Sequence, residues 1–241
     1  MQMNVFDEMG KYWAEIAEKN QTERQISFIK NHLKPQGFVL DLACGTGRHM
    51  IALSRLGFEV AGLDISMKLL RLAKQQNRQI HLIRGDIRFL PFKINAFFAA
   101  INMDTSLGYL PTKMDDKTVL IELRKVVKDN SKVVFDLFNK DQIIRKYRSE
   151  KSKRIEYPDF FLDQKRTVSI DGEWLCDSWI VHDKTNQKKY SYSHIVRLYE
   201  LQHLKKIIEE ADFEVKQVFG GYEEQMFNAK ADRLIIVACA K

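Results

Sequence analysis

One stretch near the start of the chain constrains its fold more than any other. Phe38-Val39-Leu40-Asp41-Leu42 is a short, almost wholly apolar run, and Gly45-Thr46-Gly47 follows it closely. Such a run is typical of a central parallel strand that is buried on both faces. Glycines permit a tight turn and let a ligand approach the backbone. The stretch therefore predicts a strand, a glycine loop and a helix that begins at about Arg48.

The same alternation of strand and helix continues through the first half of the chain. Helices are expected at about residues 5–18, 21–33, 48–56, 66–77 and 114–128, and strands at about 38–42, 58–64, 80–83, 97–103 and 131–137. Strands separated by helices imply right-handed crossovers and a doubly wound α/β sheet. A helix at about 201–211 and strands at 213–219 and 233–240 close the chain.

A different pattern occupies residues 150–199, where period-two alternation predicts antiparallel strands. Runs at Arg166–Ile170 and Glu173–Val181 flank Asp171-Gly172, which favours a two-residue hairpin turn. We therefore expect a single domain over 1–241. It would consist of N-terminal helices at about 1–34, a cofactor-binding core at about 35–140 and 200–241, and a small antiparallel β insertion at about 150–199 that covers the site.

The composition excludes several classes of protein. With 45% hydrophobic and 29% charged residues in 241, the chain is neither disordered nor a small disulfide scaffold. Three widely spaced cysteines favour a reducing compartment and form no zinc pattern, so no metal is expected. The N-terminus lacks an apolar signal region, and no run reaches the roughly 18–20 apolar residues of a membrane helix. We expect a cytoplasmic protein that does not bind a membrane.

The net charge of +7 raises the alternative of a nucleic-acid partner. The segment Lys140–Arg154 holds seven basic and two acidic residues, and Tyr147 is its one aromatic residue. A basic segment with so few stacking rings favours a solvated helix and loop over a nucleic-acid surface.

Three acids stand where three consecutive strands are expected to end: Asp41, Asp64 and Asp86. Ligands of open α/β sheets bind beyond the carboxyl ends of the strands. There, Asp64 is placed to accept both hydroxyls of a ribose, and Asp86 to accept from the exocyclic amine of adenine. The row therefore predicts a nucleoside site.

A nicotinamide dinucleotide fits these residues poorly. Its fingerprint has a third glycine where this chain has Met50, and the carboxylate of Asp41 would repel a diphosphate. An acid suits instead the ammonium and sulfonium groups of S-adenosylmethionine.

The chain resembles the class I S-adenosylmethionine-dependent methyltransferases along most of its length. Leu40–Gly47 is similar to the first motif of that family, Gly62–Met67 to the second and Gly85–Ile87 to the third. The resemblance implies a seven-stranded Rossmann-like sheet, a final antiparallel hairpin and S-adenosylmethionine as cofactor. It also implies that the following residues contact the cofactor: Asp41, Ala43, Gly45, Gly47, Asp64, Ile65, Met67, Asp86, Ile87 and Asn102. Tyr12 and Trp13, in the N-terminal helix, are expected either to fold over it or to pack in the core.

The acceptor is expected to be a small molecule. Residues Thr105–Tyr109 resemble a segment of small-molecule methyltransferases that carry a β-rich insertion after the fifth strand. The chain has neither a proline pair nor a Pro-Cys nucleophile after its fourth strand, so the main DNA-methylating classes are excluded. We predict transfer to nitrogen or oxygen by direct displacement, with Asp104, Tyr109 and His194 as candidate catalytic bases. His49 is expected on a helix surface with no role.

Three alternatives stay open. One is an RNA methyltransferase that uses residues 140–154 on phosphates, and another is a cofactor-binding protein without catalytic activity. The third, a nicotinamide oxidoreductase, is disfavoured by Met50 and Asp41.

Overall fold

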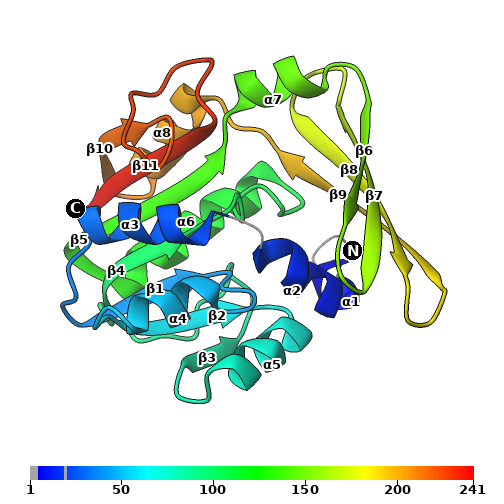
Figure 1. Ribbon diagram of the computed structural model, residues 1–241. Helices are drawn as coiled ribbons and strands as arrows, with labels where there is room; N and C mark the ends of the chain where they lie inside the picture. The colour runs from blue at the N-terminus through cyan, green and yellow to red at the C-terminus, as the bar shows by residue number, and fades with distance from the viewer. Residues whose placement is uncertain (1–4, 19–20) are drawn as a thin grey trace.

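The chain folds into a seven-stranded sheet and a separate four-stranded sheet, shown in the computed structural model of Figure 1. The structure describes residues 5–18 and 21–241. The larger sheet contains β1 Phe38–Leu42, β2 Glu59–Asp64, β3 His81–Arg84, β4 Phe97–Asn102, β5 Val127–Phe138, β10 Phe213–Phe219 and β11 Arg233–Ala240. Its order is β10-β11-β5-β4-β1-β2-β3, and β11 runs antiparallel to both of its neighbours. This confirms the predicted doubly wound sheet and its final antiparallel hairpin.

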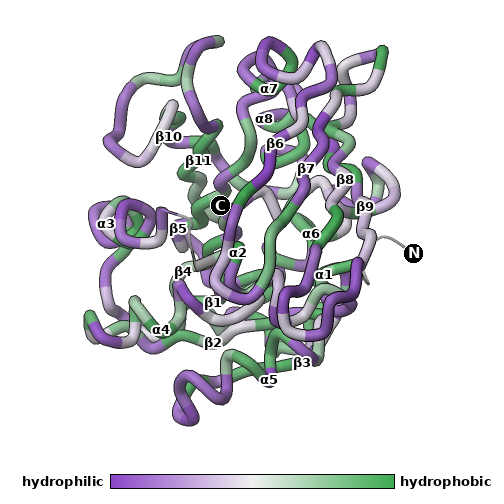
Figure 2. The backbone as a smooth tube through the Cα atoms, turned by 45° about the vertical axis from the view of Figure 1, so that its right-hand side comes forward, coloured by the Kyte–Doolittle hydropathy of each residue, from purple (hydrophilic) through white to green (hydrophobic). Residues whose placement is uncertain are grey.

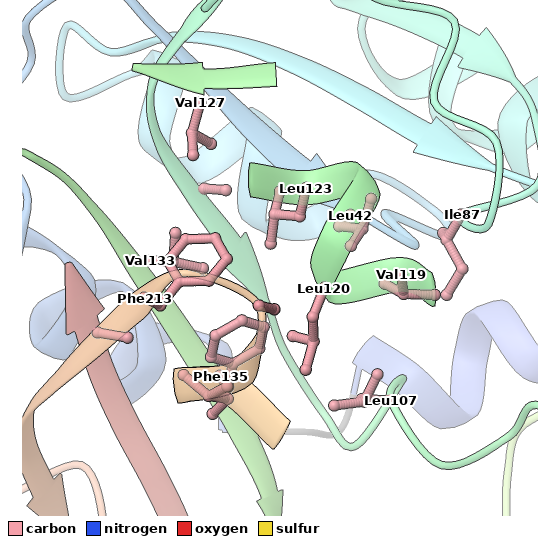
Figure 3. Packing of buried hydrophobic residues seen from close by; sticks show 14 of the residues in the cluster. Leu42, Ile87, Leu107, Val119, Leu120, Leu123, Val127, Val133, Phe135 and Phe213 are labelled. Carbon is pink, nitrogen blue, oxygen red and sulfur yellow. The ribbon is translucent and has the colours of Figure 1, made fainter. Parts of the chain in front are cut away.

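Helices cover both faces of this sheet because its strands are apolar on both sides. On one face lie α3 Thr22–His32, α4 Arg48–Ser54 and α5 Met67–Gln76; on the other lie α6 Lys113–Val126 and α8 Leu201–Glu210. Neighbouring residues of β1 face opposite ways: Val39 packs with the first group of helices and Leu40 with the second. Figure 3 shows part of the core between the larger sheet and α6, where Leu120, Leu123 and Phe135 lie close together. Each such fully buried side chain contributes about 1.5–3 kcal/mol.

Met50 is accommodated by a glycine of the sheet rather than by one of the helix. Met50 is fully buried in α4, and a Cβ added to Gly62 of β2 would lie 2.2 Å from its Sδ atom. Gly62 thus gives the close helix–strand approach that a third glycine gives in dinucleotide-binding loops. The side chain at position 50 therefore does not obstruct the packing, contrary to what its place in the glycine pattern suggests.

Two helix boundaries differ from the prediction. The helix expected over 5–18 is divided into α1 Val5–Met9 and α2 Lys11–Glu18, because Gly10 adopts a φ of +48° between them. The helix expected to reach residue 128 ends at Val126, where the chain passes directly into β5. Val127 is fully buried and pairs with Phe97 of β4, so core packing converts this residue to strand.

The second sheet is antiparallel and contains β6 Lys151–Glu156, β7 Phe160–Val168, β8 Trp174–Asp183 and β9 Lys189–Arg197 in that order. The predicted two-residue turn at Asp171-Gly172 is wrong, because the flanking strands end at Val168 and begin again at Trp174. Asp171 Oδ1 accepts from Ser169 Oγ at 2.5 Å and from the Glu173 amide at 2.9 Å. These bonds stabilise the connection between Val168 and Trp174, which is longer than a two-residue turn.

Helices α1 and α2 lie between the two sheets, as Figure 1 shows. Val5, Met9 and Tyr12 pack in one apolar cluster with Phe160 and Trp179 of the second sheet.

Helix α7 Lys140–Tyr147 connects β5 to β6. In Figure 2, β6 is mostly purple and β11 mostly green, so the second sheet ends in a hydrophilic edge strand while the larger sheet keeps an apolar interior. In the described parts of the chain, no helix is both long enough and apolar enough to cross a bilayer.

A buried ion pair ties the second sheet to the loop after β4. Arg197 of β9 pairs with Asp116 of α6, and these residues are only 3% and 0% exposed. Gly108 lies between them: its amide donates to Asp116 Oδ1 at 3.3 Å, and its carbonyl accepts from the Arg197 amide at 2.9 Å. An added Cβ at Gly108, whose φ is +106°, would lie 2.8 Å from the Arg197 carbonyl oxygen.

Replacing Gly108 with alanine should therefore destabilise the protein by roughly 2–4 kcal/mol, since backbone strain and a steric clash add. Gly57→Ala is the matched control: φ is +85° there, but no atom lies within 4 Å of the added Cβ. That control should cost only about 1–2 kcal/mol. Urea unfolding of the three proteins measures both values, and equal losses would contradict the proposed close contact.

Candidate functional site

A cavity of about 140 Å³ opens at the carboxyl ends of β1, β2 and β4 and beside the loop after β3, beneath α1 and α2. Nine of the residues predicted from the sequence line it: Asp41, Ala43, Gly45, Asp64, Ile65, Asp86, Ile87, Asp104 and Tyr109. In the sheet β1 lies between β4 and β2, and the cavity extends to both sides of the end of β1. One half follows β1 to β3, and the other faces the loop after β4.

Asp64, at the end of β2, organises the first half. Its two carboxylate oxygens accept from the Gly45 amide and the Ser66 amide, each at 2.8 Å. The glycine loop and the start of α5 are thus joined through one side chain. Each carboxylate oxygen has a second lone pair, so two further donors can still bind. Burial raises the pKa of Asp64, and these amide bonds oppose that rise.

Asp41, at the end of β1, is the group in the cavity whose hydrogen bonding is least satisfied. It is 1% exposed, and among the described residues no donor reaches its Oδ2 atom. Burial raises its pKa to about 7; Arg48 lowers that value and Asp64 raises it. A buried carboxylate without a partner is costly, so this oxygen is suited to a cationic ligand.

Asp86 differs from the other two acids because it already has a cationic partner. Arg88 Nη2 lies 2.7 Å from Asp86 Oδ2, and Arg88 also reaches Asp115 at 2.9 Å. Burial alone would raise the pKa of Asp86, but the bonds from Arg88 outweigh it and lower the value. Asp86 is therefore a fixed, ionised acceptor at the end of the cavity farthest from β4.

On the β4 side, Asp104 is held in a polar cluster. Its φ is +55°, its Oδ1 accepts from Gln25 Nε2 at 2.8 Å, and it forms an ion pair with Arg48. His49 bonds Gln25 Oε1 through Nε2 at 2.9 Å and is only 5% exposed. The expectation of a surface His49 is therefore wrong: it is buried and lines the cavity.

Five residues predicted for the site do not line the cavity: Tyr12, Gly47, Met67, Asn102 and His194. The Tyr12 hydroxyl instead donates to Asp183 Oδ2 of the second sheet at 2.5 Å. Asn102 has a supporting place, since it donates to the Leu42 carbonyl at 2.8 Å and accepts from the Leu107 amide at 3.2 Å. Gly47, with φ +71°, occupies the N-cap position just before α4.

His194 lies one layer behind the cavity. Its ring centroid is 5.6 Å from those of Phe6 and Tyr109, and it is 5% exposed. Burial, with the nearby cation of Arg166, lowers its pKa to about 4. His194 is therefore a neutral imidazole at pH 7, and a ligand in the cavity would meet Tyr109 first.

An aromatic wall lines the cavity, and of its rings Trp13 and Tyr109 were expected at the site while Phe6 was not. Phe6 of α1 and Trp13 of α2 line it together with Tyr109. The Phe6 centroid is 4.7 Å from Trp13 and 5.1 Å from Tyr109. Rings on an amphipathic helix indicate burial but not which surface buries them, and the break at Gly10 turns these two toward the cavity.

The basic segment 140–154 forms ion pairs with acids elsewhere in the chain. Arg154 donates to both carboxylate oxygens of Asp163, at 2.5 and 2.7 Å, and Lys140 pairs with Glu200 at 3.0 Å. Part of the positive charge of 140–154 is thus compensated. Over residues 5–18 and 21–241, no three His, Cys, Asp or Glu side chains come together as a metal site.

Comparisons with known proteins agree with this architecture. Residues 39–130 match a family described as methyltransferase domain. The chain is 23% identical over 248 residues to the "Putative methyltransferase YqeM" of Bacillus subtilis (strain 168), covering 97% of this chain and 96% of that one. The CcbJ methyltransferase from Streptomyces caelestis superposes with a TM-score of 0.85 at 15% identity over 100% of both chains. S-adenosylmethionine-bound CalS10, an amino pentose methyltransferase from Micromonospora echinaspora, gives 0.73 at 16% identity over 96% of each.

Asp41 should make the stability of the ligand-free protein depend on pH. Its pKa in the folded state, about 7, lies above the ordinary 3.8, so folding loses stability as the pH rises from 4 to 7. Asp41→Asn removes this loss. The free energy of unfolding of the variant minus that of the wild type should rise by roughly 2–4 kcal/mol between pH 4 and 8.

Asp86→Asn is the matched control, with the opposite sign. The lowered pKa of Asp86 gives the wild type stability above the pKa of the unfolded state, and this is lost as the pH falls through the folded-state value. The free energy of unfolding of Asp86→Asn minus that of the wild type should therefore fall as the pH rises. Urea unfolding at several pH values measures both trends. If the free energies of unfolding of Asp41→Asn and the wild type differ by the same amount at every pH, the assignment of Asp41 is refuted.

Proposed function

We propose that the protein methylates a small molecule, on the premise that residues 39–130 match a methyltransferase domain and that the chain has the fold of class I S-adenosylmethionine-dependent methyltransferases. The methyl group would pass from S-adenosylmethionine to nitrogen or oxygen by direct displacement. The observation that carries the proposal is the buried Asp41 Oδ2 atom, which has no partner among the described residues. The ammonium of the cofactor's methionine end suits that oxygen.

The other residues of the first half fit the rest of the cofactor. Asp64 has lone pairs free for the two ribose hydroxyls, and Ile65 supplies an apolar surface beside it. Asp86, ionised by Arg88, suits the exocyclic amine of adenine, with Ile87 at the same edge. Ala43 and Gly45 border the methionine end. In this proposal Gly47 and Asn102 act by shaping the glycine loop and the loop after β4, while Tyr12 and Met67 stay outside direct contact.

The second half of the cavity would hold the acceptor. S-adenosylmethionine supplies a methyl group already activated by its sulfonium. The chain then has to align the acceptor and exclude water, and orientation of this kind can supply about 7–11 kcal/mol. The cavity lies under α1 and α2 beside the second sheet, which favours a small acceptor over a polymer. The similarity to CalS10, an amino pentose methyltransferase, supports the same choice.

Among the three candidate bases, Asp104 is the best placed. It lines the cavity, and Arg48 and Gln25 hold its carboxylate. Burial raises the pKa of Tyr109 far above neutrality, so its hydroxyl is a donor rather than a base. His194 does not line the cavity, and we assign it the role of supporting Tyr109.

Labelled S-adenosylmethionine tests this function. The protein is incubated with it in the presence of a metabolite extract or of total RNA, at low and high salt. Label should enter a low-mass product, and salt should have little effect on the rate. Label in RNA that falls steeply with salt would instead favour the RNA alternative, because released counterions govern such binding.

Asp64→Ala should weaken binding of S-adenosylmethionine by roughly 1–3 kcal/mol, since the ribose hydroxyls lose their acceptor. Glu59→Ala is the control, because Glu59 is an exposed acid at the opposite end of the same strand. Isothermal calorimetry measures both. Unchanged affinity in Asp64→Ala would show that the ribose binds elsewhere.

Cofactor affinity should also depend on pH through Asp41. The carboxylate must be ionised to hold a cation, so affinity rises as the pH climbs through about 7, the pKa of Asp41 in the ligand-free protein. Above about 7.7–8.0 the ligand's amino group loses its own charge, and affinity falls again. Calorimetry from pH 5.5 to 9 should give a peak, and Asp41→Asn should lack its acidic limb. A wild-type profile without that limb would contradict the assignment.

A further inference from the structure

The acceptor half of the cavity combines aromatic rings with negative charge. We propose that the acceptor is a small amine, which binds as an ammonium ion against Phe6, Trp13 and Tyr109 and beside Asp104. This inference rests on the proposed function and specifies the acceptor of the same site.

The three rings form one continuous wall on the cavity. Phe6 lies in the centre, with its centroid 4.7 Å from Trp13 and 5.1 Å from Tyr109. Trp13 is stacked on Trp179 of β8 at 5.7 Å, and Tyr109 rests on His194 at 5.6 Å. Aromatic faces attract ammonium groups, most strongly where water is excluded. A neutral alcohol gains no such attraction.

The wall is fixed in place from both sides. Asp7 Oδ1 of α1 accepts from Ser66 Oγ at 2.7 Å and from the Lys68 amide at 3.0 Å, at the start of α5. In α2, Lys11 Nζ and the Tyr12 hydroxyl donate to Asp183 Oδ2, at 3.2 and 2.5 Å. The rings therefore need no large rearrangement to receive a ligand, which reduces the entropy cost of binding.

The charges of the lining favour a cation. Four aspartates line the cavity, Asp41, Asp64, Asp86 and Asp104; Arg48 is the one guanidinium in the lining, and Arg88, outside it, compensates Asp86. Asp104 is the one on the side of the aromatic wall, and its side chain is 28% exposed while that of Arg48 is 13% exposed. The carboxylate thus reaches the open space more than its partner does. An anionic acceptor would be repelled by this lining.

The transfer balances for an amine. The bound ammonium first gives one proton to the Asp104 carboxylate, which releases it to solvent after the transfer, and this leaves a nitrogen lone pair. That pair forms the new nitrogen–carbon bond while the methyl–sulfur bond breaks and its electrons stay on sulfur. The positive charge of the sulfonium thereby passes to the methylated nitrogen, and no oxidant or further reactant is needed.

The test compares two probes of one shape, benzylamine and benzyl alcohol. Each is titrated by calorimetry at pH 7.5 into protein saturated with S-adenosylhomocysteine. The amine should bind at least about 5- to 30-fold more tightly, which is the range expected of a cation on aromatic faces. Equal binding, a preference for the alcohol or no binding of either probe overturns the inference.

Substitutions locate the effect. Trp13→Leu should remove most of the preference for the amine, and Trp13→Phe should retain it. Phe38→Leu is the control, because Phe38 is a partly exposed ring at the start of β1, outside the lining of the cavity. A preference that persists in Trp13→Leu, or that disappears equally in Phe38→Leu, also overturns the inference.

The same samples separate this inference from the proposed function. Binding of S-adenosylhomocysteine is measured first, in every variant. If it fails in the wild type, the proposed function fails and the inference with it. If it succeeds and the amine shows no preference, only the choice of acceptor is wrong.

Discussion

The desolvation of carboxylates at one edge of a parallel sheet is the constraint on which this site depends. Hydrophobic burial of β1 on both faces carries Asp41 into the interior along with Leu40 and Leu42. Its free oxygen has no donor among the described residues, so the fold keeps a cost that a cationic ligand can relieve. Asp64 and Asp86 stand at the same edge but have amide or guanidinium partners. The three acids are therefore equivalent in sequence and different in chemistry.

The position of the second sheet beside the site depends on a second set of buried polar contacts. Asp116 and Arg197 join α6 to β9, and Gly108 lets the loop after β4 approach them closely. The same loop carries Asp104 and Tyr109 into the cavity. The position of the second sheet and that of the acceptor residues are thus set by one cluster. A change at the sheet junction should alter the cavity even though no residue of the junction lines it.

The positions of the strands and the acid row were predictable from the sequence because local patterns determine them. Apolar runs such as 38–42 and their terminal acids report burial and direction without reference to other segments. Tertiary contacts determined what was missed. Tyr12 was expected over the cofactor, but Asp183, far away in sequence, holds its hydroxyl. His49 is buried because Gln25 from another helix meets it, and Val127 became strand because β4 lies beside it. No local pattern contains those partners.

Arg48 connects the two halves of the cavity electrostatically. It forms the ion pair with Asp104, and its charge also lowers the pKa of Asp41 toward neutrality. Burial lowers the pKa of Arg48 itself to about 10, so it remains charged at physiological pH. A cation that binds at Asp41 changes the field at Arg48, and through it the field at Asp104. Binding in one half must therefore influence binding in the other, and by thermodynamic linkage the effect is reciprocal. The site is one charge system in which a single guanidinium serves two carboxylates.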